Sequence, residues 1–146
     1  MAFHFSLAAV LRVRESLEHR EQLALEQSYR HLYSVQKELS DQDERLTQIR
    51  ASYEEELRRG TMAAGLHCLL HERARAERNR VAIEQRLSEA QNEVRRHMES
   101  YRRARQQRET VTQVRNHRFA AYQKKEALAE QKVRDDLYLL RRRRHD

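Results

Sequence analysis

The stretch that decides the fold of this chain is Arg59-Gly60-Thr61-Met62-Ala63-Ala64-Gly65. The chain has 146 residues with no proline and only two glycines, and both glycines lie in this stretch. Average composition would give a chain of this length about seventeen glycines and prolines together. Because most turns need one of these residues, the chain has one place where it can reverse. The sequence therefore predicts one all-α domain over residues 1–146, in which two long helices flank a single turn.

The composition on both sides of the turn favours helices and excludes several other classes of protein. Charged residues make up 36% of the chain and hydrophobic residues only 38%, less than the roughly 45–50% typical of globular domains. Disorder has a similar signature, but Ala, Leu, Glu, Gln and Arg dominate here, and they are strong helix formers. A sheet protein and an active site carried on loops both need turn residues that are missing. No enzymatic activity and no cofactor are therefore expected.

The residues before the turn predict a first helix over about 6–59. Ser6 is a plausible N-cap, Gly60 suits the position that closes the helix, and Thr61 is available to cap a short turn that leads into the second helix. Apolar residues recur at spacings of three and four, an average of about 3.5 that is typical of a coiled-coil seam. The predicted seam contains Leu7, Val10 or Leu11, Leu17, Ala24 or Leu25, Leu32, Val35, Leu39, Gln42, Leu46, Ile49, Tyr53 and Leu57.

The residues after the turn predict a longer second helix over about 66–143. Its seam contains Leu66, Leu69 or Leu70, Ala76, Ile83, Leu87, Ala90, Val94, Tyr101, Ala104 and Val111. The phase slips near residues 115–119, and a new stripe continues as Phe119, Tyr122, Ala129, Val133, Leu137 and Leu140. Folding the chain as an antiparallel coiled-coil hairpin sets residue 7 opposite about residue 118, so that about 25 residues extend past the first helix. This stripe has no partner within the hairpin and should bury itself in another molecule.

Charge is distributed unequally between the two helices. Residues 1–60 hold 9 Lys and Arg against 11 Asp and Glu, whereas residues 61–146 hold 21 against 12. The excess ends in the run Arg141–Arg144, which is compatible with nucleic acid, an acidic membrane surface, an acidic protein ring or simple solvation. Acidic residues interrupt the basic face, so nucleic acid is not expected; they are Glu126, Glu130, Asp135 and Asp136.

Metal and membrane sites receive little support from the sequence. His67 and His71 are four residues apart, a spacing that can hold zinc, but Cys68 lies about 100° round the helix and no further ligand cluster follows. No metal is therefore expected, and a single cysteine excludes an internal disulfide. No run reaches the ~18 apolar residues of a membrane span, and no cleavage site for a signal peptide follows the start. A cytoplasmic location is the default expectation.

Both ends of the chain resemble the flagellar export protein FliJ family. The start follows the pattern Phe3-x-Phe-x-Leu-x-x-Val-Leu-x-x-Arg-x-x-x-Glu18. The closing segment contains Arg118-Phe-Ala-Ala-Tyr122 and Glu126-Ala-Leu-Ala-Glu-Gln-Lys-Val-Arg-Asp-Asp136. The chain length and the turn at mid-chain also fit, so the resemblance covers the whole chain. Stalk proteins of virulence-type secretion systems are the nearest confusable group.

The resemblance implies a stalk-like component of flagellar type III protein export, which regulates an ATPase and has no catalysis of its own. Members insert into the flagellar export ATPase hexamer, link it to the cytoplasmic domain of the export gate and escort export chaperones. The protein would then be a monomer when free, and cytoplasmic at the flagellar base, peripheral to the inner membrane. A generic structural coiled coil and a basic nucleic-acid-binding coiled coil are the alternatives.

The same resemblance implies two contact regions. The residues expected to contact the ATPase ring are Arg118, Tyr122, Gln131, Arg134 and Asp135. Those expected to meet the export gate near the turn are Leu46, Ile49, Tyr53, Leu66 and Leu70, although the same residues also belong to the predicted seam.

Overall fold

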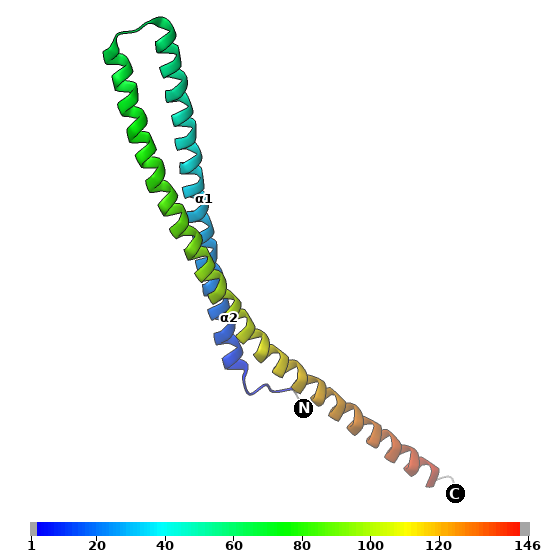
Figure 1. Ribbon diagram of the computed structural model, residues 1–146. Helices are drawn as coiled ribbons and strands as arrows, with labels where there is room; N and C mark the ends of the chain where they lie inside the picture. Colours follow the sequence, from blue (N-terminus) through cyan, green and yellow to red (C-terminus); the bar gives the residue numbers. More distant parts are fainter. Residues whose placement is uncertain (1–2, 144–146) are drawn as a thin grey trace. The chain divides into compact units, whose positions relative to one another are not determined.

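The computed structural model describes residues 3–143, and within that range the chain forms two α-helices and no strand. Helix α1 spans Ala8–Arg59 and helix α2 spans Ala63–Arg143 (Figure 1). The prediction of an antiparallel two-helix hairpin with a longer C-terminal helix is confirmed. The turn is shorter than expected, because α2 begins at Ala63 instead of Leu66. At its other end, α1 begins at Ala8 instead of Ser6.

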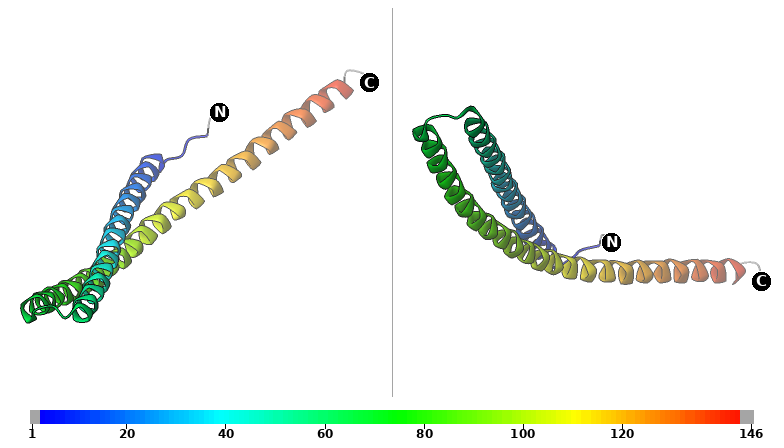
Figure 2. Two further views of the ribbon diagram at one scale, coloured as in Figure 1. Left: turned by 90° about the horizontal axis from the view of Figure 1, so that it is seen from above. Right: turned by 45° about the horizontal axis from the view of Figure 1, so that its top comes forward.

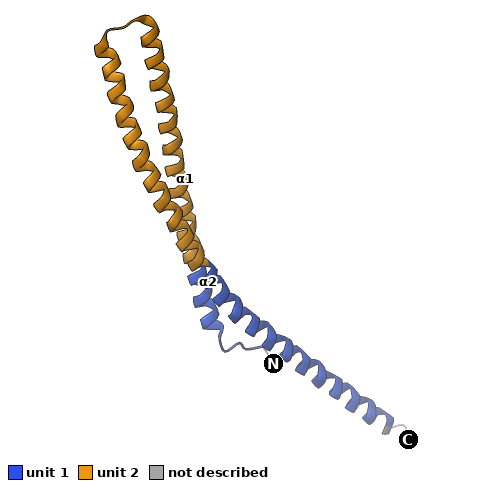
Figure 3. Ribbon diagram, viewed as in Figure 1, with its two compact units in different colours: residues 1–19, 102–146 blue, residues 20–101 orange. Residues whose placement is uncertain are grey.

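The chain divides into two compact units, each of which contains a segment of both helices (Figure 3). Unit 1 comprises residues 1–19 and 102–146, and unit 2 comprises residues 20–101. In unit 2 the two segments run side by side in opposite directions up to the turn, as Figure 1 and the right panel of Figure 2 show and the contacts between them require. In unit 1 the start of α1 lies beside α2, which then continues alone.

The turn is closed by a hydrogen-bonding pattern that needs a left-handed residue. Gly60 has a φ of 67°, the conformation in which glycine meets no penalty. Its amide donates to the carbonyl of Leu57 at 3.3 Å, and the amide of Thr61 donates to the carbonyl of Glu56 at 3.3 Å. These two bonds form a Schellman motif. The Thr61 hydroxyl donates to the Glu56 carboxylate, so the hydroxyl of Thr61 contacts the end of α1 and not the start of α2.

The seam of unit 2 follows the predicted 3.5-residue spacing, with some members exchanged. Leu57 is 52% exposed and Leu70 44% exposed, and both lie outside the seam. Glu56 occupies the place expected of Leu57. The spacing also brings in polar residues that an apolar pattern does not mark, namely Ser28, Arg80 and His97. Extending the 3.5-residue spacing through positions with polar side chains would have included these three residues in the predicted seam.

One polar side chain of the seam sets the alignment of the two helices in unit 2. The amide of Gln42 donates to the backbone carbonyl of Ala76 at 2.9 Å, across the seam. Ala76 is 3% exposed, and its small side chain leaves space for this approach. Ion pairs on the flanks agree with the same alignment: Arg80 with Asp43, Arg86 with Glu38, and Arg45 with Glu72. Because these pairs are exposed and screened by water, none of them is a major source of stability.

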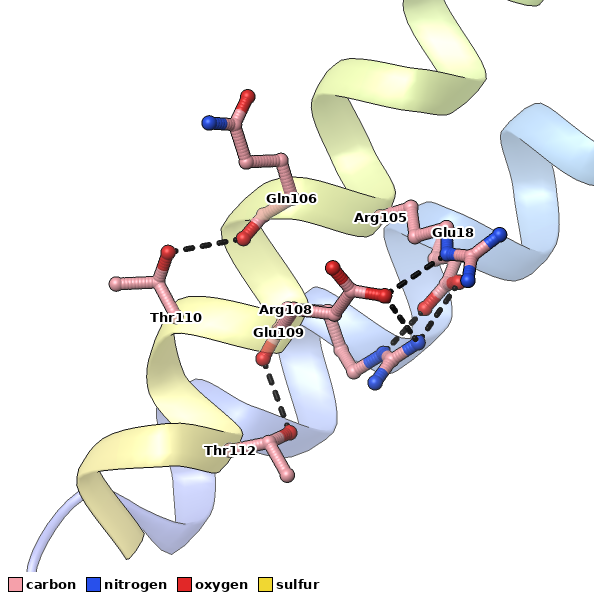
Figure 4. A network of polar contacts seen from close by, with 7 residues as sticks. All are labelled: Glu18, Arg105, Gln106, Arg108, Glu109, Thr110 and Thr112. Carbon is pink, nitrogen blue, oxygen red and sulfur yellow. Dashed lines mark hydrogen bonds and ion pairs between the residues drawn. The ribbon is translucent and has the colours of Figure 1, made fainter. Parts of the chain in front are cut away.

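The interface of unit 1 contains an ion pair inside the seam (Figure 4). Arg108 donates from Nε and Nη2 to the two carboxylate oxygens of Glu18, at 2.6 and 3.2 Å. The two side chains are only 26% and 16% exposed. Hydrogen bonding to Arg108 holds the pKa of Glu18 below its ordinary value, more strongly than the partial burial of Glu18 raises it. Near this pair, Leu11 and Ala104 supply buried apolar contacts.

The start of the chain confirms the predicted alignment but corrects the predicted cap. Ser6 accepts a hydrogen bond from Nη1 of Arg118 at 2.8 Å, which agrees with the expected pairing of residue 7 with about 118. The first turn is instead formed by the amide of Ala8, which donates to the carbonyl of Phe5 at 3.1 Å. The Ser6 hydroxyl therefore contacts α2, and the helix begins two residues later.

Gly60→Ala is expected to lower the free energy of unfolding by about 1–2 kcal/mol, because a side chain in the left-handed region is strained. No atom lies within 4 Å of the added Cβ, so the loss would measure backbone strain alone. Gly65→Ala is the matched control, because Gly65 is helical and its added Cβ would meet Thr61 at an ordinary 3.5 Å. This control should gain about 0.5–1 kcal/mol in the same urea unfolding experiment. Equal effects in the two variants would contradict the assigned turn.

Glu18→Gln is expected to lower the free energy of unfolding by about 1 kcal/mol at neutral pH, because the charged acceptor of Arg108 is lost. Since the folded pKa of Glu18 is depressed, the stabilisation is present above pH about 4.5 and is lost as the pH falls through the folded pKa. The variant should therefore show a flatter fall of stability in acid. Unfolding measured between neutral pH and pH about 3 tests this, with the exposed Glu44→Gln as control. A control that flattens the profile equally would contradict the assignment.

Candidate functional site

The C-terminal part of α2 is a surface of unit 1 that no other segment among residues 3–143 covers. From Gln123 to Arg142 every side chain is exposed, and we call residues 123–143 the C-terminal extension. Its large apolar side chains are between 51% and 67% exposed; they are Leu128, Val133, Leu137, Tyr138, Leu139 and Leu140. A concentration of apolar side chains in water marks a binding surface.

The apolar side chains of the extension do not all lie on one face of the helix. Val133, Leu137 and Leu140 are separated by four and three residues and form one stripe. Leu128 is nine residues from Leu137, which sets it about 180° away round the helix. The extension therefore offers apolar contacts on opposite faces.

The charges of the extension are mixed in sign. Lys and Arg residues are interspersed with Glu and Asp. One pair, Arg134 with Glu130, is joined at 3.4 Å while both side chains stay more than two-thirds exposed. Of the expected ring contacts, Gln131, Arg134 and Asp135 lie here, open to solvent. Arg144, the last arginine of the terminal run, lies outside the described residues.

The first two members of the stripe have an intramolecular partner and are partly covered, which corrects the expectation that the whole stripe lacks one. The ring of Phe3 lies 5.1 Å from that of Phe119, edge to face, and 5.6 Å from that of Tyr122. Arg118 stands over the ring of Phe5 at 5.9 Å. Residues 3–7 are not helical, and the side chains of Phe3, Phe5 and Ser6 contact α2, which a helix-based alignment does not foresee. Arg118 and Tyr122, the other two expected ring contacts, are thus already in contact with the chain's own N-terminal segment.

Tyr122 also contacts the next turn of α2. Its hydroxyl donates to the carboxylate of Glu126, and this hydrogen bond is the largest cause that raises the pKa of Tyr122. Glu126 follows at a spacing of four residues and lies on the same face as the stripe. The stripe therefore has an acidic group between its covered start and its open end.

The residues expected to meet the export gate lie mostly in the seam. Ile49 is 5% exposed, and Leu46, Tyr53 and Leu66 are half-buried, so only Leu70 has a largely open side chain. The apolar surface at the turn includes, besides Leu70, residues outside the predicted contact set. Met62, which is 83% exposed, and Leu57 are the largest of them. The sequence could have indicated Met62 as an exposed apolar residue, because it lies inside the predicted turn.

Metal and membrane sites find no support among residues 3–143. The rings of His67 and His71 lie 4.9 Å apart, edge to face, and Cys68 is exposed. In this part of the chain no group of three His, Cys, Asp or Glu side chains is arranged to hold a metal ion. Neither of its helices has a stretch apolar and long enough to span a membrane.

Comparison with known protein families matches residues 3–146 to the family described as Flagellar FliJ protein. The chain belongs to the FliJ family. This FliJ family member is accordingly a component of a type III protein export apparatus, in a family of non-catalytic components. The resemblance inferred from the two ends of the sequence is therefore confirmed.

A solved structure supports the fold of this FliJ family member. A protein described as a YscO homolog, CT670 from Chlamydia trachomatis, superimposes with a TM-score of 0.67 over 99% of this chain and 98% of its own. The two sequences are 17% identical, so the likeness concerns the fold alone. A search of curated proteins found no match.

Proposed function

We propose that this protein is the stalk of the flagellar export ATPase. The C-terminal extension inserts into the ATPase hexamer, and the end of the hairpin at the turn contacts the cytoplasmic domain of the export gate. Export chaperones are further partners, escorted by the same molecule. The observation that carries the proposal is the exposed apolar surface of a helix that continues beyond its partner helix.

The distribution of the apolar side chains favours a partner that surrounds the helix. A flat partner would cover the stripe of Val133, Leu137 and Leu140 but leave Leu128 in water, on the opposite face. A ring covers both faces at once. One helix with its side chains is about 10–12 Å wide, and twenty residues of it span about 30 Å, dimensions suited to the axial channel of a ring. The mixed charges can pair with the polar residues that line such a channel.

The surface at the turn supports the contact with the export gate. Met62, Leu57 and Leu70 are all exposed there, at the end of unit 2 where α1 and α2 are joined. We propose these three as the apolar part of the gate contact, in place of the buried Ile49.

Val133→Asp is expected to abolish or reduce at least tenfold the ability of the protein to raise the ATPase activity of the hexamer. A buried carboxylate without a partner costs several kcal/mol, which is more than the roughly 1.4 kcal/mol needed for a tenfold loss. The measurement is the rate of ATP hydrolysis as each variant is titrated into the purified export ATPase. Val81→Asp is the matched control, since Val81 is 53% exposed, Val133 is 58% exposed, and both lie on α2.

Both variants should fold like the wild type, because neither side chain is buried in the free chain. Thermal unfolding followed by circular dichroism checks this. If the wild-type protein leaves the ATPase rate unchanged, or if both variants lose stimulation equally, the proposed insertion is wrong.

The free protein is expected to be a monomer, because the seam that a parallel coiled coil would bury between two chains is already filled within one chain. Sedimentation equilibrium should give the mass of one chain, 17.7 kDa. A stable dimer would favour the alternative of a self-associating structural coiled coil. Duplex binding that weakens steeply with added salt would favour the nucleic-acid alternative.

A further inference from the structure

The residues Phe3–Leu7 form a short non-helical segment that crosses from the start of α1 to α2, within unit 1. We call Phe3–Ser6 the strap. Three contacts attach it to α2: Phe3 packs against Phe119 and Tyr122, Phe5 lies under Arg118, and Ser6 accepts a hydrogen bond from the same arginine.

The contacts of the strap differ in burial. Phe5 is 8% exposed and belongs to the packed end of unit 1, together with Leu11. Phe3 is only half-buried, and its main partner Phe119 remains 42% exposed. The outer end of the strap therefore rests on a partly hydrated pair of rings, whereas its inner end is anchored in the interface. Segments with few buried contacts open at low cost.

The strap lies on residues directly before the C-terminal extension, the surface that the proposed function assigns to a partner. Phe119 and Tyr122 are the first members of the apolar stripe, which continues uncovered through Val133 and Leu137. A ring subunit that contacts the stripe along its full length would need the place now held by the ring of Phe3. Such a subunit would therefore compete with the ring of Phe3 for contact with Phe119 and Tyr122.

We propose that the strap is a displaceable cover of the ATPase-binding stripe, with the ring of Phe3 as its removable part. In the free chain it partly shields Phe119 and Tyr122 from water. When the ATPase hexamer binds, Phe3 leaves, Phe5 remains anchored, and the stripe becomes accessible from residue 119 to residue 140. This inference rests on the proposed stalk function, since it names the contact that the partner replaces.

The position of the strap can be followed with a single fluorescent reporter. The protein contains no tryptophan, so Phe3→Trp introduces one indole at the outer end of the strap. In the free chain its emission should be blue-shifted, and quenching by acrylamide should be at least twofold weaker than in the double variant Phe3→Trp with Phe119→Ala. Titration with the hexameric export ATPase should then shift the emission to the red and restore quenching.

Affinity supplies the second measurement. Phe3→Ala removes the competing ring and should lower the Kd for the hexamer about threefold to tenfold, the range expected from the loss of one or two aromatic pairs. His4→Ala is the matched control, because His4 lies in the same segment and its side chain is exposed. The control should bind like the wild type.

Each other outcome overturns the inference in a recognisable way. If the introduced indole is quenched as strongly in the free Phe3→Trp chain as in the double variant, the strap is not seated. If the indole stays protected in the complex, or if Phe3→Ala binds no tighter than the wild type, the strap is not displaced, while the stalk function stands. If neither the wild type nor Phe3→Ala binds the hexamer, the proposed function fails and the strap has no competitor, even when the indole is protected in the free chain.

Discussion

The structure depends on one narrow seam between α1 and α2. Long polar helices gain little from their own hydrogen bonds in water, so their stability must come from packing of one face. Only a few side chains are fully buried along this seam, with Val35 and Ala90 at 1% exposure as the most complete cases. Because few side chains are fully buried, polar interactions are also needed to fix the alignment of α1 with α2. Gln42 supplies one of them by bonding to the backbone of Ala76, and the flanking ion pairs agree with it.

The two units use this seam differently. Unit 2 has mostly apolar buried residues, among them Val35, Ile49 and Ile83. Unit 1 replaces much of that core with the Glu18–Arg108 pair and with aromatic contacts from the chain's start. Charged and half-exposed contacts give less stability than apolar burial, and they respond to pH and to competing ligands. The unit that carries the C-terminal extension is therefore the one whose own interface relies more on charged and half-exposed contacts.

Much of the architecture followed from sequence periodicity. Steps of three and four predicted the seam, and the two glycines predicted the reversal, with Gly60 in its expected left-handed conformation. The predicted seam was incomplete where its members are polar, as with Ser28 and Arg80, since apolar side chains alone do not mark those positions. Near the turn, Glu56 replaced Leu57 in the seam because the spacing of the helix continues to its end regardless of residue type.

The sequence by itself determined two helices, one turn, their unequal lengths and the exposed stripe on the longer one, because these depend on local conformational preference and on period. Only the tertiary structure decided the conformation and the contacts of residues 3–7. The contacts of Phe3 and Arg118 join residues more than a hundred positions apart, through a segment that is not helical and carries no period. Such contacts depend on which part of α2 lies beside the start of α1, and no local sequence pattern predicts them.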